Sequence, residues 1–157
     1  MNLLHIGSAV VWVDFVTILL HSVFDFGRSL DVWYRRFGIV AVLSDCLVIV
    51  LGILIAQFLV PTASVSILAG VSVLVQLVHD YLFYILVILG VPKGHNEMID
   101  LFKQYASENS WKILVADSLM IGSTVFLADG FSSLNPSIVQ FLGLLGTYAL
   151  TYVIYTR

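Results

Sequence analysis

Charge is scarce in this sequence, and its scarcity decides the class of protein. Only 11% of the 157 residues are charged and 60% are hydrophobic, whereas about 25% charged residues is typical of soluble domains. A soluble chain of this length buries only about 70% of its surface, too little to hide so many apolar side chains. The composition therefore indicates an integral, multi-pass membrane protein, and the lipid bilayer is its first expected partner.

Features of several other functional classes are also missing. The single cysteine, Cys46, excludes an intrachain disulfide and argues against a thiolate metal site. The net charge is −3 and basic residues form no run, so nucleic-acid binding is not expected. Positive residues are absent from Met1 to Ala9, so we expect the first apolar segment to be a retained span. No HExxH or GxSxG motif is present, so the sequence carries no positive sign of an enzyme.

Five apolar segments are long enough to cross a bilayer, which requires about 20 residues per helix. They cover about residues 3–24, 37–60, 65–91, 111–128 and 136–155. Pro61 and Pro136 mark helix boundaries, and Pro92 follows the third segment. We therefore expect an all-α protein in which one domain forms a five-helix transmembrane bundle.

Lysine and arginine set the expected orientation, because cytoplasmic loops are enriched in them. Three arginines follow the first span, three lysines lie between the third and fourth spans, and Arg157 ends the chain. The loops at 61–64 and 129–135 contain neither residue. All seven basic residues fall on one side of the membrane if the N-terminus is outside and the C-terminus inside.

The segment before the fourth span has a helical pattern of its own. Asn96 is a plausible N-cap, and apolar residues recur after it at i, i+3, i+4 and i+7: Met98, Leu101, Phe102 and Tyr105. We expect a short amphipathic helix over about residues 96–108, lying along the inner membrane surface. The alternative is a cytosolic helix packed on the loop of residues 28–36.

Four aspartates interrupt the apolar segments: Asp14, Asp45, Asp80 and Asp117. Each lies six to eleven residues from the end of its span that is expected inside, which is roughly 9–17 Å at about 1.5 Å rise per residue. Because successive spans alternate in direction, equal depth does not follow from spacing along the chain. The sequence therefore predicts one layer of acids in the inner half of the bilayer.

The second and fourth spans also resemble each other around their acids. Residues 44–49 (SDCLVI) align with residues 116–121 (ADSLMI), and both spans start from the same side. A parallel duplication of a two-helix unit, with the fifth span added, would explain this likeness. In the fifth span Gly143, Thr147 and Thr151 predict a ridge of small residues suited to close helix packing.

An acid in the bilayer needs partners, and the sequence offers few cationic ones. A charged carboxylate in mid-span costs about 2.5–3.5 kcal/mol, so the four acids are expected to face the bundle interior. No lysine or arginine lies between Phe37 and Pro92, and only His21 and His79 lie near the acid layer. Gln76 and Tyr84 share a helix face with Asp80. The acids can be protonated, paired with a histidine, or exposed to water and a bound cation.

These alternatives lead to two main functional hypotheses. The first is a proton or cation channel or transporter whose pathway uses Asp14, His21, Asp45, Gln76, His79, Asp80, Tyr84 and Asp117. The second is a structural membrane protein in which the acids fix helix register and the chain assembles with copies of itself or with other proteins. No cofactor is predicted; haem or a divalent metal held by His21 and His79 is the third alternative.

Several hydrophobic strings carry a resemblance to a known group of proteins. They are DCLVIVLGILIAQF (45–58), VQLVHDYLFY (75–84), GHN (94–96) and IDLFK (99–103). They resemble uncharacterised small multi-span membrane proteins of large DNA viruses of algae and protists. The resemblance implies a protein of a viral inner membrane or of a host membrane, and it implies no catalytic residues.

Overall fold

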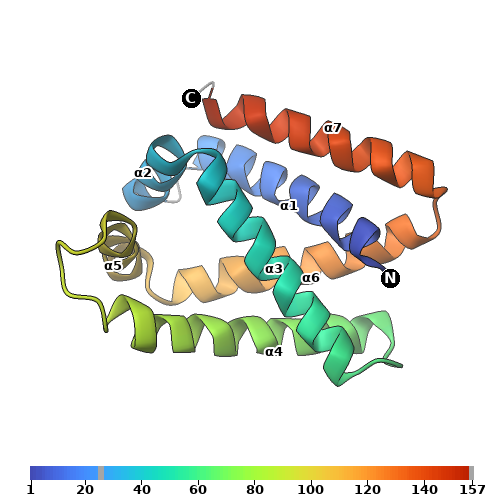
Figure 1. Ribbon diagram of the computed structural model, residues 1–157, viewed down its shortest axis with the longest axis horizontal. Helices are drawn as coiled ribbons and strands as arrows, with labels where there is room; N and C mark the ends of the chain where they lie inside the picture. The colour runs from blue at the N-terminus through green and yellow to red at the C-terminus, as the bar shows by residue number, and fades with distance from the viewer. Residues whose placement is uncertain (25–26, 156–157) are drawn as a thin grey trace.

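The computed structural model describes residues 1–24 and 27–155, which are mostly helical and include no strand (Figure 1). The helices are α1 (Leu3–Phe24), α2 (Arg28–Phe37), α3 (Ile39–Leu59), α4 (Val65–Phe83), the π-helical segment η1 (Tyr84–Ile88), α5 (Glu97–Asn109), α6 (Trp111–Ser132) and α7 (Pro136–Tyr155). Five of these stretches are long and apolar enough to cross a membrane: α1, α3, α4 with η1, α6 and α7. An all-α protein with five candidate spans is therefore confirmed.

Two predicted span boundaries need correction. The third span ends at Ile88 instead of about residue 91, because the chain leaves η1 through a turn before Pro92. The fourth span continues past Ala128 to Ser132, so the predicted loop at 129–135 is mostly helix. Gly130 lies within this helical extension, where its missing side chain does not break the hydrogen-bond ladder.

The segment of residues 28–36, predicted as a loop, is the helix α2. Leu30, Trp33, Tyr34 and Phe37 recur along it at i, i+3, i+4 and i+7, which is the apolar stripe of an amphipathic helix. The helix predicted over 96–108 is α5, and the Asn96 side chain caps it by accepting from the N–H groups of Met98 and Ile99 at 2.9 and 3.1 Å.

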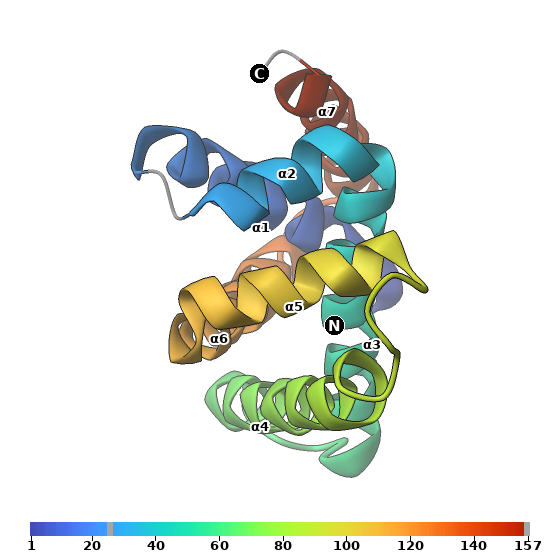
Figure 2. The same ribbon diagram turned by 90° about the vertical axis from the view of Figure 1, so that its left-hand side faces the viewer.

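Both short helices lie across the same end of the bundle (Figure 2). The six lysines and arginines of the described residues belong to this end: three lie in α2, and Lys93, Lys103 and Lys112 lie before, within and just after α5. Arg157 lies outside the described residues. The two connections that carry lysine and arginine, around α2 and around α5, therefore lie at the same end of the fold.

The final helix, α7, packs along α1 (Figure 1). Ser8 donates to the carbonyl oxygen of Val139 at 3.1 Å, and Trp12 donates from Nε1 to that of Leu142 at 3.0 Å. A Cβ on Gly143 would lie 2.5 Å from the Ser8 hydroxyl oxygen, so this contact requires glycine.

Gly146 is the second point of close approach on α7, because a Cβ there would lie 2.8 Å from Val11 Cγ2. Thr147 and Thr151, predicted to share the packing ridge, instead hydrogen-bond to carbonyl oxygens of their own helix. The packing face of α7 therefore combines these two glycines, three residues apart, with buried aliphatic residues of the helix, and it is not the i, i+4, i+8 ridge.

Two three-helix units follow each other along the chain, each made of a span, a short helix and a second span. A single residue with positive φ joins the last two helices of each unit: Gly38 (φ 50°, ψ −123°) and Ser110 (φ 47°, ψ −125°). An aspartate, Asp45 or Asp117, follows seven residues later in each unit. The first spans, α1 and α4, run in the same direction (Figure 1). This common architecture supports the predicted parallel duplication and extends its unit from two helices to three.

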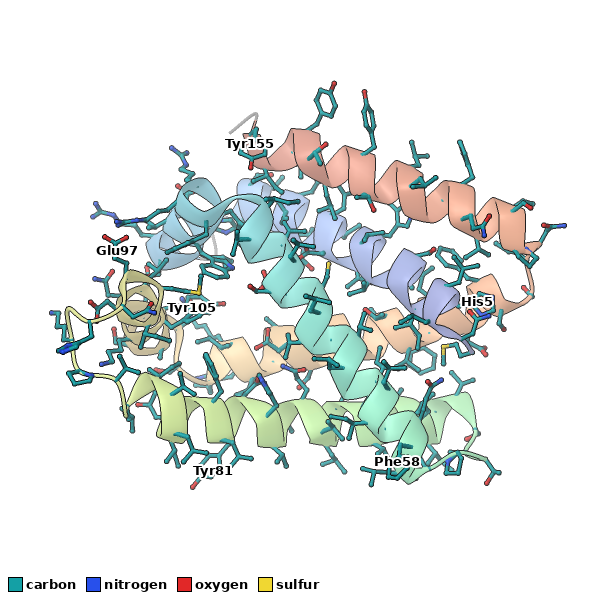
Figure 3. The ribbon with its side chains drawn as sticks, viewed as in Figure 1. His5, Phe58, Tyr81, Glu97, Tyr105 and Tyr155 are labelled. Carbon is teal, nitrogen blue, oxygen red and sulfur yellow. The ribbon has the colours of Figure 1, made fainter. Side chains whose placement is uncertain are left out.

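The outer surface of the bundle is apolar to an extent that water would not tolerate. Phe58 and Tyr81 project away from the neighbouring helices (Figure 3) and are 85% and 63% exposed. Large apolar side chains are exposed on all five candidate spans. Such a continuous apolar surface is typical of helices that face lipid.

Candidate functional site

A pocket of about 1130 Å³ lies beneath the two short helices. Side chains of α3, α4, η1 and α6 form its walls, and side chains of α2 and α5 close it at the end of the bundle. Three of the four aspartates in the spans line it: Asp45, Asp80 and Asp117. Gln76, His79 and Tyr84, which were predicted to accompany them, are also part of the lining.

Asp45 receives two hydrogen bonds from α2. Trp33 Nε1 and the Tyr34 hydroxyl donate to its Oδ2 at 3.3 and 3.2 Å. The one-residue link at Gly38 allows α2 to turn back over the first turns of α3, which brings these donors to the carboxylate. Burial, followed by the nearby Asp45 carboxylate, raises the pKa of Tyr34 well above its ordinary value, so its hydroxyl stays a donor.

Asp80 lies in a small polar group on α4. Gln76 donates from Nε2 to Asp80 Oδ1 at 2.8 Å, and His79 Nδ1 lies 3.1 Å from the same oxygen. The His79 ring stacks on Phe83 with centroids 5.8 Å apart. Asp80 Oδ2 and Gln76 Oε1 are buried and have no hydrogen-bond partner in the described part of the chain. The Asp80 group therefore has acceptor capacity left over.

Asp117, on α6, lines the pocket together with Asp45 and Asp80. The Tyr105 phenol of α5 belongs to the same lining. Burial and the Asp117 carboxylate raise the pKa of Tyr105 above its ordinary value, so this phenol also remains protonated. Lys112 is the one lysine or arginine in the described lining. Three acids therefore share the pocket with a single permanent cation.

Asp14 has different surroundings from the other three acids. It is completely buried, and the Cys46 thiol donates to its Oδ2 with Sγ 3.8 Å away. The pocket lining in the described residues includes neither Asp14 nor His21. Cys46 directly follows Asp45, so adjacent residues of α3 contact the buried Asp14 and line the pocket, respectively.

His21 is directed toward the short helix α2. Its Nε2 lies 3.8 Å from Asp31 Oδ1, and Asp31 is also paired with Arg35 at 3.1 Å. His79 instead lies at the pocket, beside Asp80. Within the described residues no three His, Cys, Asp or Glu side chains come together as a metal site would require. The two histidines therefore have separate partners, an arrangement that does not favour haem or metal held between them.

No protein-family model matches this chain. No curated protein or solved structure matches it significantly either. The functional hypothesis therefore rests on the arrangement of the pocket residues.

The sequence predicted contact between α5 and residues 28–36 only as an alternative, and it did not predict that residues 28–36 form a helix that closes the pocket. Trp33 packs on Phe102 with ring centroids 4.8 Å apart, and Arg36 pairs with Glu97 at 2.6 Å. Glu108 accepts from the N–H groups of Arg28 and Ser29, both at 2.9 Å, and so caps the first turn of α2. The packing of α5 on residues 28–36 agrees with the cytosolic alternative for this helix. The apolar periodicity of residues 30–37 was the signal that could have revealed the contact.

Proposed function

We propose that this chain is a small polytopic membrane protein that takes protons or cations into the acid-lined pocket and carries them across the membrane. One observation carries the proposal: carboxylates from three different spans line a single pocket whose described lining includes one lysine. Each ionised carboxylate costs about 2.5–3.5 kcal/mol in a membrane. A bound proton or cation offsets that cost and the mutual repulsion of the acids.

The expected orientation places this pocket near the cytoplasmic face. Because cytoplasmic loops are enriched in lysine and arginine, the basic residues of α2, α5 and their flanks favour the inner side for this end of the bundle, with the N-terminus outside and the C-terminus inside. In this orientation α2 and α5 lie along the inner membrane surface, and their polar faces meet water. A cation would reach the acids from this half of the bilayer.

Beyond the pocket the bundle is tightly packed. Ile53, Ile121 and Val125 have no exposed surface, and they continue α3 and α6 away from the acids. An apolar plug of this kind blocks an open pore, because an ion in contact with it would lose its hydration. The arrangement therefore favours a gated transporter over a permanently open channel.

Flux measurements on the purified chain in proteoliposomes test the proposal. Under an imposed potential we expect movement of protons or monovalent cations that Asp45→Asn, Asp80→Asn and Asp117→Asn each reduce at least about tenfold. Asp129→Asn is the matched control, because Asp129 lies on α6, is acidic and exposed, and is outside the pocket lining. Absence of flux in the wild-type chain, or equal flux in all variants, would refute the proposal.

A structural membrane protein that assembles with partners, of a viral membrane or of its host, remains the second candidate. The buried contact between Asp14 and Cys46 favours it, because this contact ties α1 to α3 without reaching the pocket. Under this alternative the aspartate variants change thermal stability or assembly in detergent, and no transport activity is lost. Chemical cross-linking and unfolding curves on the same variants distinguish the two candidates.

A further inference from the structure

We infer that the pocket accepts a hydrophobic organic cation, an apolar or aromatic body that carries one positive charge. The inference rests on the proposed function, since it uses the same carboxylates as the cation-binding groups. It adds the chemical class of the ligand, which the acids alone leave open between a proton, a metal ion and a larger molecule.

The size of the pocket is the first reason. Its volume of about 1130 Å³ is slightly above the roughly 300–1000 Å³ of pockets that hold drug-sized ligands. A proton needs no cavity, and a bare metal ion needs several oxygen or nitrogen ligands within about 2–3 Å. The described residues include no group of three acidic, histidine or cysteine side chains placed to hold such an ion. The space therefore fits a molecule and not a bare ion.

The composition of the walls is the second reason. Eight aromatic side chains line the pocket, contributed by α2, α4, η1, α5 and α6. Trp33 and Tyr34 hydrogen-bond to Asp45, and Tyr105 lies close enough to Asp117 for the acid to act on its hydroxyl, so aromatic groups and carboxylates are interleaved. Aromatic faces attract cations, most strongly where water is excluded, and they are the usual walls of sites for organic ammonium groups. A pocket in which aromatic rings surround acids therefore selects a ligand that carries positive charge on an apolar body.

Two unpartnered acceptors on α4 point to the same ligand, and one unpartnered donor, Asn109 Nδ2 on α5, also belongs to the described lining. Gln76 is 3% exposed and lines the pocket, yet its Oε1 has no hydrogen-bond partner among the described residues. Asp80 Oδ2 is likewise buried and unpartnered. Both are acceptors, and the Nε2 donation to Asp80 fixes which end of the Gln76 amide is the oxygen. An unpaired buried acceptor is costly, and a cationic ligand would stabilise this end of the wall.

The exposed part of the lining indicates how such a ligand enters. Tyr84 on η1 and Trp111, Leu114, Val115 and Leu119 on α6 both line the pocket and are exposed. All five belong to candidate membrane spans. The rim between η1 and α6 therefore faces the region that lipid would occupy, and a molecule dissolved in the bilayer can reach the acids without crossing α2 or α5.

Binding of two ions of the same shape and opposite charge tests the inference. The probes are tetraphenylphosphonium, a cation, and tetraphenylborate, an anion, added to the purified full chain in lipid nanodiscs, with empty nanodiscs subtracted. We expect saturable binding of the phosphonium alone. Asp45→Asn and Asp117→Asn should each weaken it at least about tenfold, and Asp129→Asn should leave it unchanged.

A second variant covers the case in which loss of a carboxylate disturbs folding. Ala106→Trp on α5 fills the pocket and removes no acid, and we expect it to prevent phosphonium binding while helical content persists. Equal binding of both probes, or phosphonium binding that none of these substitutions weakens, would overturn the inference. Proton or potassium flux that depends on the acids, without phosphonium binding, would overturn the inference and leave the proposed function standing. Phosphonium binding without transport of any cation would support the ligand class and contradict carriage across the membrane.

Discussion

The units α1–α3 and α4–α6 contain the same parts, but their interiors differ. In the first unit the aspartate of the leading span, Asp14, is sealed against Cys46 and has no exposed surface. In the second unit the aspartate of the leading span, Asp80, lines a large pocket. The helix α7 packs along α1 and has no counterpart against α4 in the described fold. The comparison teaches that the same order of helices can bury one acid against a neighbouring span and leave its counterpart lining a pocket.

Overpacking the contact between α1 and α7 should have the largest effect. Gly146→Leu would place a side chain where even a Cβ comes within 2.8 Å of Val11, and overpacking typically costs about 1–3 kcal/mol. We expect a clearly lower midpoint of thermal unfolding in detergent, followed by circular dichroism. Gly130→Leu on α6 is the control, because no atom lies within 4 Å of a Cβ there. Equal midpoints for the two variants would mean that the contact between α1 and α7 does not stabilise the first unit.

Removing the sealed acid should have the next largest effect. Asp14→Ala leaves the Cys46 thiol without its acceptor and opens a small cavity, so we expect destabilisation of about 1–3 kcal/mol. Asp117→Ala, in the pocket, should change the unfolding midpoint much less and abolish flux instead. The division between structural and accessible acids breaks down if the two variants lose stability and flux in parallel.

The cap that Glu108 provides for α2 should give a smaller, pH-dependent effect. Hydrogen bonds from the Ser29 hydroxyl and from the N–H groups of Ser29 and Arg28 lower the pKa of Glu108 below its ordinary 4.5. A lowered pKa in the folded state means that the stabilisation is complete above pH 4.5 and is lost as pH falls through the folded value.

The comparison of wild type with Glu108→Gln measures this cap. We expect the wild type to unfold at a higher temperature near pH 7, and the difference to shrink as the medium is acidified below about pH 4.5. A difference that grows on acidification would show that the ionised carboxylate does not hold the closure of the pocket.

The ion pair between Arg36 and Glu97 should have the smallest effect. The two side chains are 55% and 73% exposed despite their 2.6 Å contact, and exposed pairs contribute about 0–1 kcal/mol. Arg36→Gln should therefore shift the unfolding midpoint slightly at low salt and not at about 1 M salt, where the Debye length is about 3 Å. A large shift that survives high salt would indicate that this pair, and not the Trp33–Phe102 packing, joins α2 to α5.

The sequence predicted the spans well because apolar length is a local property. The start of α1 at Leu3 and of α6 at Trp111 required nothing beyond hydropathy and flanking residues. It also predicted that Asp45, Asp80 and Asp117 belong together, since loop charges fix alternating directions and hence depth. It could not predict that Asp14 is sealed, because that depends on how α3 crosses α1. The sequence did not predict that α2 closes the pocket, because a segment of ten residues with several charges is too short and too polar to be recognised as a span.

The links at Gly38 and Ser110 show how the difference between the two three-helix units affects which residues each turn can hold. The two turns have nearly the same φ and ψ, yet one is glycine and the other carries a side chain. A Cβ on Gly38 would lie 2.8 Å from the Tyr155 hydroxyl oxygen, near the end of α7, whereas Ser110 is exposed. The backbone of both turns strains an L side chain, because φ is positive in each. A side chain at position 38 would meet the Tyr155 hydroxyl in addition to this strain, whereas Ser110 bears the backbone strain alone.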